Sequence, residues 1–230
     1  GIFPCIVGTA ILSLGSLLLA FPLGVASAVY LNEYAKRNAF ARFVRLGVNN
    51  LAGVPSVVFG LFGLSFFVTF CGFGVSILSG VLTLAVLTLP VIIGTAEEAL
   101  RNVPDTYREA SLALGATKWQ TIRRVVLPNA LPGIITGITL TAGRAMGETA
   151  ILIFTAGTTV SRQLPDFDVT AAGETLAVHM WYVMAVGLVP DRVDIANGIG
   201  ALLIITILLF NLAFTIPMKL LQRKLGSSSH

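Results

Sequence analysis

The chain has 230 residues, of which 55% are hydrophobic and 11% are charged, and its formal net charge is +4. Soluble domains usually carry about 25% charged residues, so the composition excludes an ordinary soluble protein and indicates an all-α, polytopic membrane protein. The basic balance does not imply a nucleic-acid partner, because an unequal placement of basic residues on the two sides of a membrane produces the same excess.

Five apolar runs are long enough to cross a membrane as helices. A span needs roughly 20 mostly apolar residues to cross the hydrocarbon layer. The chain is therefore predicted to fold as a single transmembrane domain over residues 1–230, with spans at about 6–32, 51–73, 77–97, 129–157 and 197–218. Two longer polar segments join them: 98–128 follows the third span and 158–195 follows the fourth.

Basic residues gather on one side of these predicted spans. Of the 15 Lys and Arg residues, four lie in the 33–46 loop, five at 98–127 and three in the tail at 219–224. The opposite side holds Arg162 and Arg192. Loops rich in Lys and Arg stay in the cytoplasm. We therefore expect residue 1 to lie outside, and both the 98–128 segment and the C-terminus to lie in the cytoplasm.

The 98–128 segment is predicted to begin with a short helix. Pro104 is tolerated in a first helical turn, where its missing N–H does no harm, and Gly115 favours a stop. These two residues place a helix at about 104–114. A tight turn at Gly115 then leads into the second half of the segment.

A second helix is expected after that turn. Thr117 and Gln120 have the spacing of a capping box, and the helix they begin should weaken near Pro128. The whole segment is too polar to enter lipid and too regular for a slack linker, so we interpret it as a docking surface. The alternative is a solvated loop that only joins two spans.

The same segment carries a motif spread over about twenty residues. It reads Glu109-Ala110-Ser111, three residues, Gly115, nine residues, and Val125-Val126-Leu127-Pro128. This order resembles the EAA coupling loop of the membrane subunits of ABC importers, from whose commonest form Ser111 and Val125 depart.

The resemblance implies a docking site for a dimer of cytoplasmic ATP-binding subunits. The residues it assigns to docking are Arg108, Glu109, Ala110, Ser111 and Gly115. The chain has no GxxxxGK(S/T) phosphate loop. ATP hydrolysis is therefore expected to come from the partner, and the chain is expected to be a transport subunit rather than an enzyme, with no cofactor of its own.

The fourth predicted span contains two opposite charges. Arg144 and Glu148 lie four residues apart in Gly143-Arg144-Ala145-Met146-Gly147-Glu148-Thr149-Ala150, and residues at that spacing share one face of a helix. Each charge costs at least about 2.5–3.5 kcal/mol in the middle of a membrane helix, so the pair should face a bundle interior, a partner or water.

We expect Thr141, Arg144, Glu148 and Thr149 to line the substrate pathway, where the Arg144 guanidinium offers its donors to a tetrahedral oxyanion. The alternative is that Arg144 and Glu148 neutralise each other as a structural tie. Gly133 and Gly137 continue the same face toward the start of the span. Small residues favour close helix approach, so this row is expected to lie at a contact between spans or subunits.

A second resemblance concerns the solute. The string Gly-Arg-Ala-x-Gly-Glu-Thr-Ala around Arg144 resembles the signature of the permeases of the Pst-type phosphate importer. Stretches at 30–35, 53–63 and 116–122 are similar to the A-type subunit of that system. The resemblance implies a type I ABC importer permease-like helix bundle in the plasma (inner) membrane of a bacterium or archaeon. It also implies two partners, a second related permease and an external phosphate-binding protein.

The chain departs from that family in two respects. Family members usually carry six spans, so a further span is expected before Gly1. Relatives commonly have proline after Glu-Thr-Ala, where this chain has Ile151. The coupling loop alone does not specify the solute, so importers of molybdate, sulfate or an amino acid are alternatives, as is a membrane component of phosphate signalling. A membrane enzyme is disfavoured, because HExxH and GxSxG motifs are both missing.

The two cysteines are not predicted to bind metal or to form a disulfide. Cys5 and Cys71 lie in apolar runs without a CxxC pattern or a nearby histidine, so both are interpreted as small buried residues. His179 lies in a moderately apolar piece of the 158–195 segment, which is expected to form an interfacial helix near the outer mouth. A lone histidine there is expected to be satisfied by ordinary contacts rather than to act as a ligand.

Overall fold

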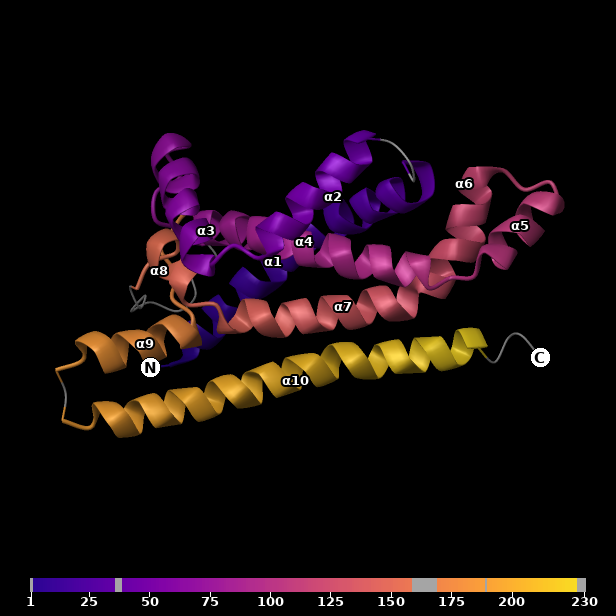
Figure 1. Ribbon diagram of the computed structural model, residues 1–230. Helices are drawn as coiled ribbons and strands as arrows, with labels where there is room; N and C mark the ends of the chain where they lie inside the picture. The colour runs from indigo at the N-terminus through magenta and orange to yellow at the C-terminus, as the bar shows by residue number, and fades with distance from the viewer. Residues whose placement is uncertain (1, 36–38, 159–168, 189, 227–230) are drawn as a thin grey trace. The chain divides into compact units, whose positions relative to one another are not determined.

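The computed structural model describes residues 2–35, 39–158, 169–188 and 190–226, and Figure 1 shows their helices in chain order. Within these ranges the chain is helical and contains no strand, which confirms the predicted all-α class. Three basic residues that the sequence assigns to a membrane side, Lys36, Arg37 and Arg162, lie outside the described residues.

Four long helices carry most of the apolar sequence: α1 (Phe3–Val29), α4 (Ile77–Arg101), α7 (Leu127–Gly147) and α10 (Arg192–Gly226). By length and composition, four stretches can cross a membrane, namely Phe3–Tyr34, Ile77–Arg101, Lys118–Gly147 and Arg192–Ala213. The first includes a π-helical turn, η1 (Tyr30–Tyr34). These stretches overlap four of the five predicted spans, and their crossing of a membrane stays a prediction.

The fifth candidate span is interrupted. Helix α2 (Ala39–Ala52) and helix α3 (Ser56–Gly63), which a π-helical turn, η2 (Leu64–Phe70), prolongs, pass the same test only when they are taken together. The break falls inside the predicted span, because Pro55 stands directly before α3 in an extended conformation. A proline also keeps the residue before it out of the helical region, which stops α2 from running on.

The fourth predicted span is not one helix. Helix α7 stops at Gly147, and a separate short helix, α8 (Ala150–Thr155), follows after two residues. Ile151 and Leu152 of α8 are fully buried in the core of their unit. The break itself falls at two polar residues, Glu148 and Thr149, and the helix that follows it is held by packing in this core.

At its other end, α7 is longer than predicted. Helix α6 (Lys118–Thr121) continues through a π-helical turn, η3 (Ile122–Val126), directly into α7. The N–H of Leu127 donates to the carbonyl of Ile122, which makes this turn wider than an α-helical one. A wider turn leaves more room for the Pro128 ring, which in a regular α-helix crowds the carbonyl four residues earlier, that of Arg124. Pro128 therefore modifies the helix without ending it.

The chain divides into two compact units, of which unit 1 comprises Gly1–Leu19, Val54–Thr88 and Ala142–Ala213. Its main core gathers Leu12, Leu84 and Leu152 from α1, α4 and α8. A smaller apolar cluster joins the start of α1 to α9 (Leu176–Val186) and α10. The presence of α9 confirms the helix predicted around His179, while its interfacial location stays a prediction.

Unit 2 comprises Ala20–Gly53, Leu89–Thr141 and Phe214–His230. Its core joins the end of α1 to α4 and α7, and a second cluster packs η1 and α2 against α4. Small residues bring two of these helices together, since a Cβ added to Gly133 would lie 2.8 Å from the Cβ of Ala99. This contact confirms that the row of small residues in α7 marks a helix–helix interface.

The two cysteines differ in exposure. Cys5 is buried, as predicted, whereas Cys71 is exposed and the prediction for it was wrong. Cys71 follows the last residue of η2, and residues 71–75, which lead toward α4, are all exposed. An apolar neighbourhood in sequence does not bury a residue that ends its helix.

Candidate functional site

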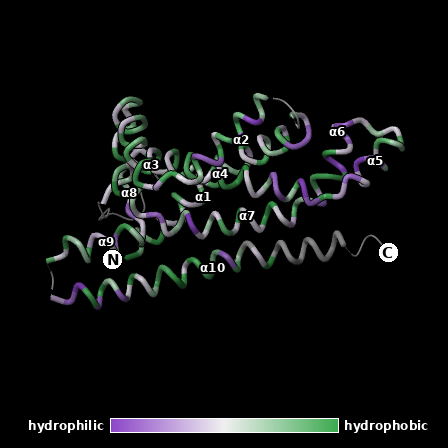
Figure 2. The backbone as a smooth tube through the Cα atoms, in the orientation of Figure 1, coloured by the Kyte–Doolittle hydropathy of each residue, from purple (hydrophilic) through white to green (hydrophobic). Residues whose placement is uncertain are grey.

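The 98–128 segment forms a helix, a tight turn and a second helix, as the sequence predicts (Figure 1). Helix α5 is Asp105–Ala113, and Gly115 follows with φ of +83°, a conformation that favours glycine. The Thr117 hydroxyl accepts from the N–H of Gln120, and the Gln120 side chain accepts from the N–H of Thr117, so the capping box is complete. Figure 2 shows hydrophilic residues gathered in α5 and α6.

Arg108 holds α5 in place from its inner side. Its Nη2 donates to Glu33 Oε1 at 2.9 Å, and the two side chains are only 12% and 5% exposed. The same guanidinium donates to the carbonyls of Leu100 at 2.9 Å and Val103 at 2.7 Å. It also pairs with the exposed Asp105 at 3.0 Å. A buried charge is tolerated when its partners satisfy it, so Arg108 ties α5 to η1 and to the end of α4.

Further contacts fix α6 to its neighbours within unit 2. The hydroxyls of Ser111 and Thr121 lie 3.0 Å apart and join α5 to the end of α6. The Lys118 ammonium lies over the ring of Tyr34, 4.7 Å from its centroid, which adds a cation–π contact between α6 and η1. The two short helices are therefore held as one rigid element.

The opposite face of α5 is open. Glu109 and Ala110 are both exposed, and Leu114 at the turn is 90% exposed. Gly115 is also at the surface. Of the five predicted docking residues, three are therefore exposed, and the other two fasten the element that carries them.

A second buried carboxylate ties basic residues in unit 2. Glu97 Oε1 accepts from Arg45 Nε at 2.6 Å and from Arg101 Nη2 at 2.8 Å. Arg45 also donates from Nη2 to the carbonyl of Leu31 at 2.7 Å. These bonds fix α2 to α4 and to η1.

The charged pair of the fourth span lies at the end of α7. Arg144 is in the last turn and Glu148 is in the break that follows. Arg144 Nε lies 3.6 Å from Glu148 Oε1, and the arginine side chain is 51% exposed. Among the described residues, no hydrogen bond or ion pair engages the two Nη atoms of Arg144. Most of its donors are therefore free for another partner.

Two threonines were predicted to accompany this pair. Thr149 lies beside Glu148 in unit 1, and its hydroxyl donates to the carbonyl of Gly147 at 3.4 Å. Thr141 is buried in unit 2, and its hydroxyl donates to the carbonyl of Gly137 at 2.8 Å. Thr149 is therefore the sequence neighbour of the Arg144–Glu148 pair, whereas the Thr141 hydroxyl bonds within α7. That these four residues line a substrate pathway stays a prediction.

The sequence pattern of one protein family, described as the binding-protein-dependent transport system inner membrane component, matches residues 20–227. The chain belongs to that family. As a transport component of this kind, it shares its fold with a chain of the MetNI methionine ABC transporter solved in inward-facing conformations. The TM-score is 0.73 over 95% of this chain and 93% of that one, at 23% identity.

A second solved structure agrees on the fold. A chain of a bacterial ABC transporter involved in the import of the acidic polysaccharide alginate matches with a TM-score of 0.63, over 93% of this transport component and 78% of that chain, at 18% identity. At such identities the likeness concerns the fold alone. It confirms the predicted ABC importer permease-like architecture.

Closer relatives are found by sequence. The transport component is 43% identical over 208 residues to the probable ABC transporter permease protein YqgI of Bacillus subtilis, which covers 86% of this chain and 71% of that protein. It is 41% identical over 179 residues to the phosphate transport system permease protein PstA 1 of Mycobacterium tuberculosis strain H37Rv. That match covers 78% of this chain and 58% of the mycobacterial protein.

Sequence reasoning missed the two buried glutamates that organise unit 2. Glu33 and Arg108 are separated by 75 positions, so no local spacing pairs them. A weaker signal was present, because both Glu33 and Glu97 stand at the polar end of an apolar run, where a charge needs a partner. That signal identifies a carboxylate in need of a cation without saying which cation.

Proposed function

We propose that this chain is the membrane-spanning permease subunit of an ATP-driven importer of inorganic phosphate. The observation that carries the proposal is the 41% identity, over 78% of the chain, to a protein named as a phosphate transport system permease. Two features of the site agree with it. The α5–α6 element is exposed in an ABC permease fold, and the Arg144 guanidinium at the end of α7 has free donors.

In this proposal, α5 and its turn dock onto a cytoplasmic ATP-binding subunit, of which the complex contains two copies. Ala110 and Gly115 are small and exposed, so the helix can seat closely in a groove. Glu109 offers an exposed carboxylate to basic groups of that groove. Arg108 acts as a positioning residue, since it fixes α5 through Glu33.

The continuous helix from α6 to α7 transmits the movement. At a rise of about 1.5 Å per residue, the 30 residues of Lys118–Gly147 are enough to cross the roughly 30 Å of the hydrocarbon core. One uninterrupted helical run, Lys118–Gly147, connects the docking element to the charged pair along the chain. When ATP-driven closure tilts the docking element, the Arg144 end moves with it, as alternating access requires.

Arg144 is the proposed contact for phosphate. Its free Nη donors form a planar fork that matches two oxygens of a tetrahedral oxyanion. Glu148 contacts the guanidinium from one side and opposes permanent capture of the anion through its own negative charge. Thr149 adds a hydroxyl next to Glu148.

The remaining partners follow from the same assignment. We propose a second related permease, an external phosphate-binding protein and a location in the inner membrane, with the α5–α6 element and the C-terminus in the cytoplasm. The concentration of Lys and Arg at 33–46, 98–127 and 219–224 supports that orientation. Bacillus subtilis has two proteins named as probable ABC transporter permeases, YqgI and YqgH, that are 43% and 38% identical to this chain, which supports pairing of related permeases.

Reconstitution tests the proposed solute. The permease pair, its ATPase and its binding protein are placed in proteoliposomes, and uptake of labelled phosphate is followed with and without ATP. ATP-dependent uptake that excess sulfate and molybdate do not inhibit is the expected result. Uptake of molybdate or sulfate instead assigns another solute, and ATP hydrolysis without uptake of any of them favours the signalling role.

Arg144→Ala tests the proposed contact. Hydrogen bonds to charged groups contribute about 1.5–3 kcal/mol each, so phosphate uptake should fall by about 10- to 100-fold, while association with the ATPase is unchanged. Arg192→Ala, which removes an exposed arginine from the first turn of α10, is the matched control. Wild-type uptake by Arg144→Ala would leave the Arg144–Glu148 pair as a structural tie only.

A further inference from the structure

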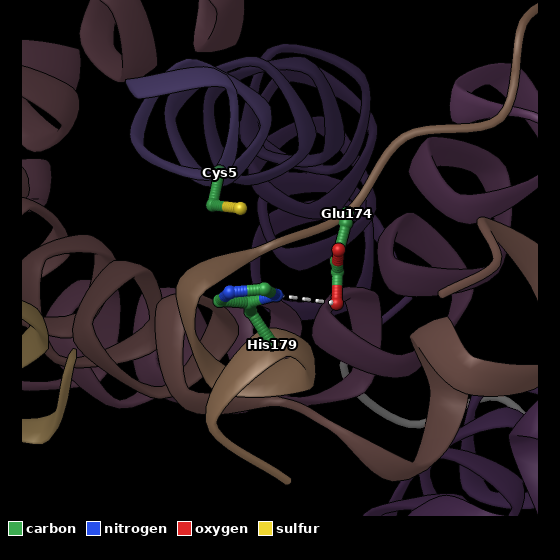
Figure 3. Close-up of side chains that lie close together, drawn as sticks. All are labelled: Cys5, Glu174 and His179. Atoms are coloured by element: carbon green, nitrogen blue, oxygen red, sulfur yellow. Dashed lines mark hydrogen bonds and ion pairs between the residues drawn. The ribbon is translucent and has the colours of Figure 1, made fainter. Parts of the chain in front are cut away.

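Three side chains of the kinds that bind metals converge in unit 1. Cys5 comes from the first turn of α1, Glu174 precedes α9, and His179 lies in the first turns of α9 (Figure 3). One ligand atom from each of the three lies within 4.8 Å of the other two. None of the three belongs to the Arg144–Glu148 pair or to the docking residues.

The spacing of these atoms suits a tetrahedral ion. His179 Nδ1 and Glu174 Oε1 lie 3.1 Å apart. Two ligands that share one zinc ion through bonds of about 2.0–2.1 Å lie about 3.3 Å apart, so this pair already has the spacing of a chelate. The Cys5 sulfur, with its longer bond of about 2.3 Å, comes into range through a shift of about 1 Å.

One carboxylate oxygen of Glu174 is buried without a hydrogen-bond partner among the described residues. The side chain of Glu174 is 1% exposed, and this oxygen is Oε2. A buried carboxylate oxygen without a partner costs free energy. A cation between the three side chains supplies what Oε2 lacks.

The ligands are held in place by a relay of hydrogen bonds. The N–H of Leu176, the first residue of α9, donates to the Thr9 hydroxyl at 3.0 Å, and that hydroxyl donates to the carbonyl of Cys5 at 2.7 Å. Gly8 lies against the carbonyl of Glu174 and leaves no room there for a Cβ. The backbones that carry Cys5 and Glu174 are therefore fixed against each other before any ion binds, as a preorganised site requires.

We propose that Cys5, Glu174 and His179 bind a divalent transition-metal ion of the zinc class. Thiolate, imidazole and carboxylate are the ligand types that Zn²⁺ takes in proteins, and a site with three protein ligands keeps a fourth position for water. On binding, the Cys5 thiol loses its proton to solvent as the metal–sulfur bond forms. The ion clips the start of α1 to α9.

The test is metal binding by the protein purified in detergent, first with Co²⁺ as a spectroscopic probe and then with Zn²⁺. The chain contains two cysteines, so in Cys71→Ser protein any thiolate-to-cobalt charge-transfer band must come from Cys5. We expect that band in Cys71→Ser protein, a stoichiometry of one Zn²⁺ per chain, and release of the ion by a chelator. Loss of an outer-shell partner typically lowers metal affinity by about 10- to 100-fold. Cys5→Ser, Glu174→Gln and His179→Gln each remove a direct ligand and should weaken binding at least as much.

Two outcomes would overturn the proposal. If folded Cys71→Ser protein binds Co²⁺ without a thiolate band, or binds none, then Cys5 is not a ligand and the cluster is a hydrogen-bonded His179–Glu174 pair. If all three ligand variants retain one Zn²⁺ per chain, the ion is held elsewhere. Both readouts are independent of transport, so failure here leaves the proposed phosphate import untouched, and the reverse is also true.

Discussion

Two arginines of this chain show how burial separates a structural charge from one that can meet a ligand. Arg108 is 12% exposed and has satisfied partners on every side, whereas Arg144 is 51% exposed and contacts Glu148 through Nε alone among the described residues. A guanidinium whose five N–H donors all make hydrogen bonds within the protein stabilises the fold. A guanidinium that contacts its partner through one nitrogen alone keeps its other donors available to an anion.

Removal of Arg108 should destabilise the protein severely. Arg108→Ala leaves the buried Glu33 carboxylate without its cation, which typically costs about 3–5 kcal/mol. Arg108→Lys should not rescue stability, because an ammonium cannot reach the carboxylate and two carbonyls together. Thermal unfolding in detergent measures the effect, with Arg124→Ala, exposed in η3, as the control. Equal midpoints for Arg108→Ala and the control would show that the buried pair contributes nothing to stability.

Charge reversal at Glu109 should weaken association with the ATPase without unfolding the permease. The side chain is exposed on the open face of α5, so Glu109→Lys places like charges together in the proposed groove and should lower affinity by about tenfold or more. Titration of the purified ATPase onto the permease measures it. Glu98→Lys reverses an exposed charge on α4 and serves as the control; unchanged affinity for Glu109→Lys removes this residue from the docking surface.

At the scale of elements, the turn between α5 and α6 is the best-specified part of the docking surface. Its stop depends on one residue at φ of +83°, and its restart depends on the Thr117 capping box. Both features depend on residues within the turn itself. Rigid presentation of Glu109 and Ala110 therefore depends on the conformation of Gly115.

Gly115→Ala is expected to strain this turn. A side chain in the left-handed region costs about 1–2 kcal/mol, so the variant should unfold at a lower temperature and bind the ATPase more weakly. Gly47→Ala is the matched control, because Gly47 lies inside α2 with nothing near its added Cβ and without a positive φ. Alanine should stabilise that helix by about 0.5–1 kcal/mol. Equal destabilisation by both changes would mean that the turn imposes no special conformation.

How much of the structure the sequence predicts depends on the distance over which its cause acts. The α5–α6 element was predictable because Gly115 and Thr117 act on adjacent backbone. The break after Gly147 was not predicted, because the apolar run was taken as one span and the packing of Ile151 in a core assembled from several helices is not visible in the local sequence. The partners of Glu33 and Glu97 and the convergence of Cys5 with His179 were missed for the same reason. Contacts between residues that are distant in the sequence cannot be recognised from the residues next to either of them.

At the scale of the whole molecule, hydropathy and charge together predict a direction across the membrane. The basic segments near the ends of the long helices are anchored internally in part, since Arg45, Arg101 and Arg108 bind buried carboxylates of unit 2. An internally paired arginine still resists translocation as the chain inserts, when its partner is not yet in place. We therefore expect the proposed orientation to be set during insertion, before the ion pairs form.

Labelling of single cysteines tests that orientation. In a Cys71→Ser background, Leu114→Cys puts a thiol on the α5–α6 turn, and Leu188→Cys puts one between α9 and α10; both positions are at least 90% exposed. A membrane-impermeant maleimide should label Leu188→Cys in intact spheroplasts and Leu114→Cys only in inside-out vesicles. The background protein, whose remaining Cys5 is buried, controls for reaction elsewhere. Labelling of Leu114→Cys in intact spheroplasts, with Leu188→Cys labelled only in inside-out vesicles, would place the docking surface outside the cell. A cytoplasmic ATP-binding subunit could not bind it there, and the proposed mechanism would be refuted whatever the solute.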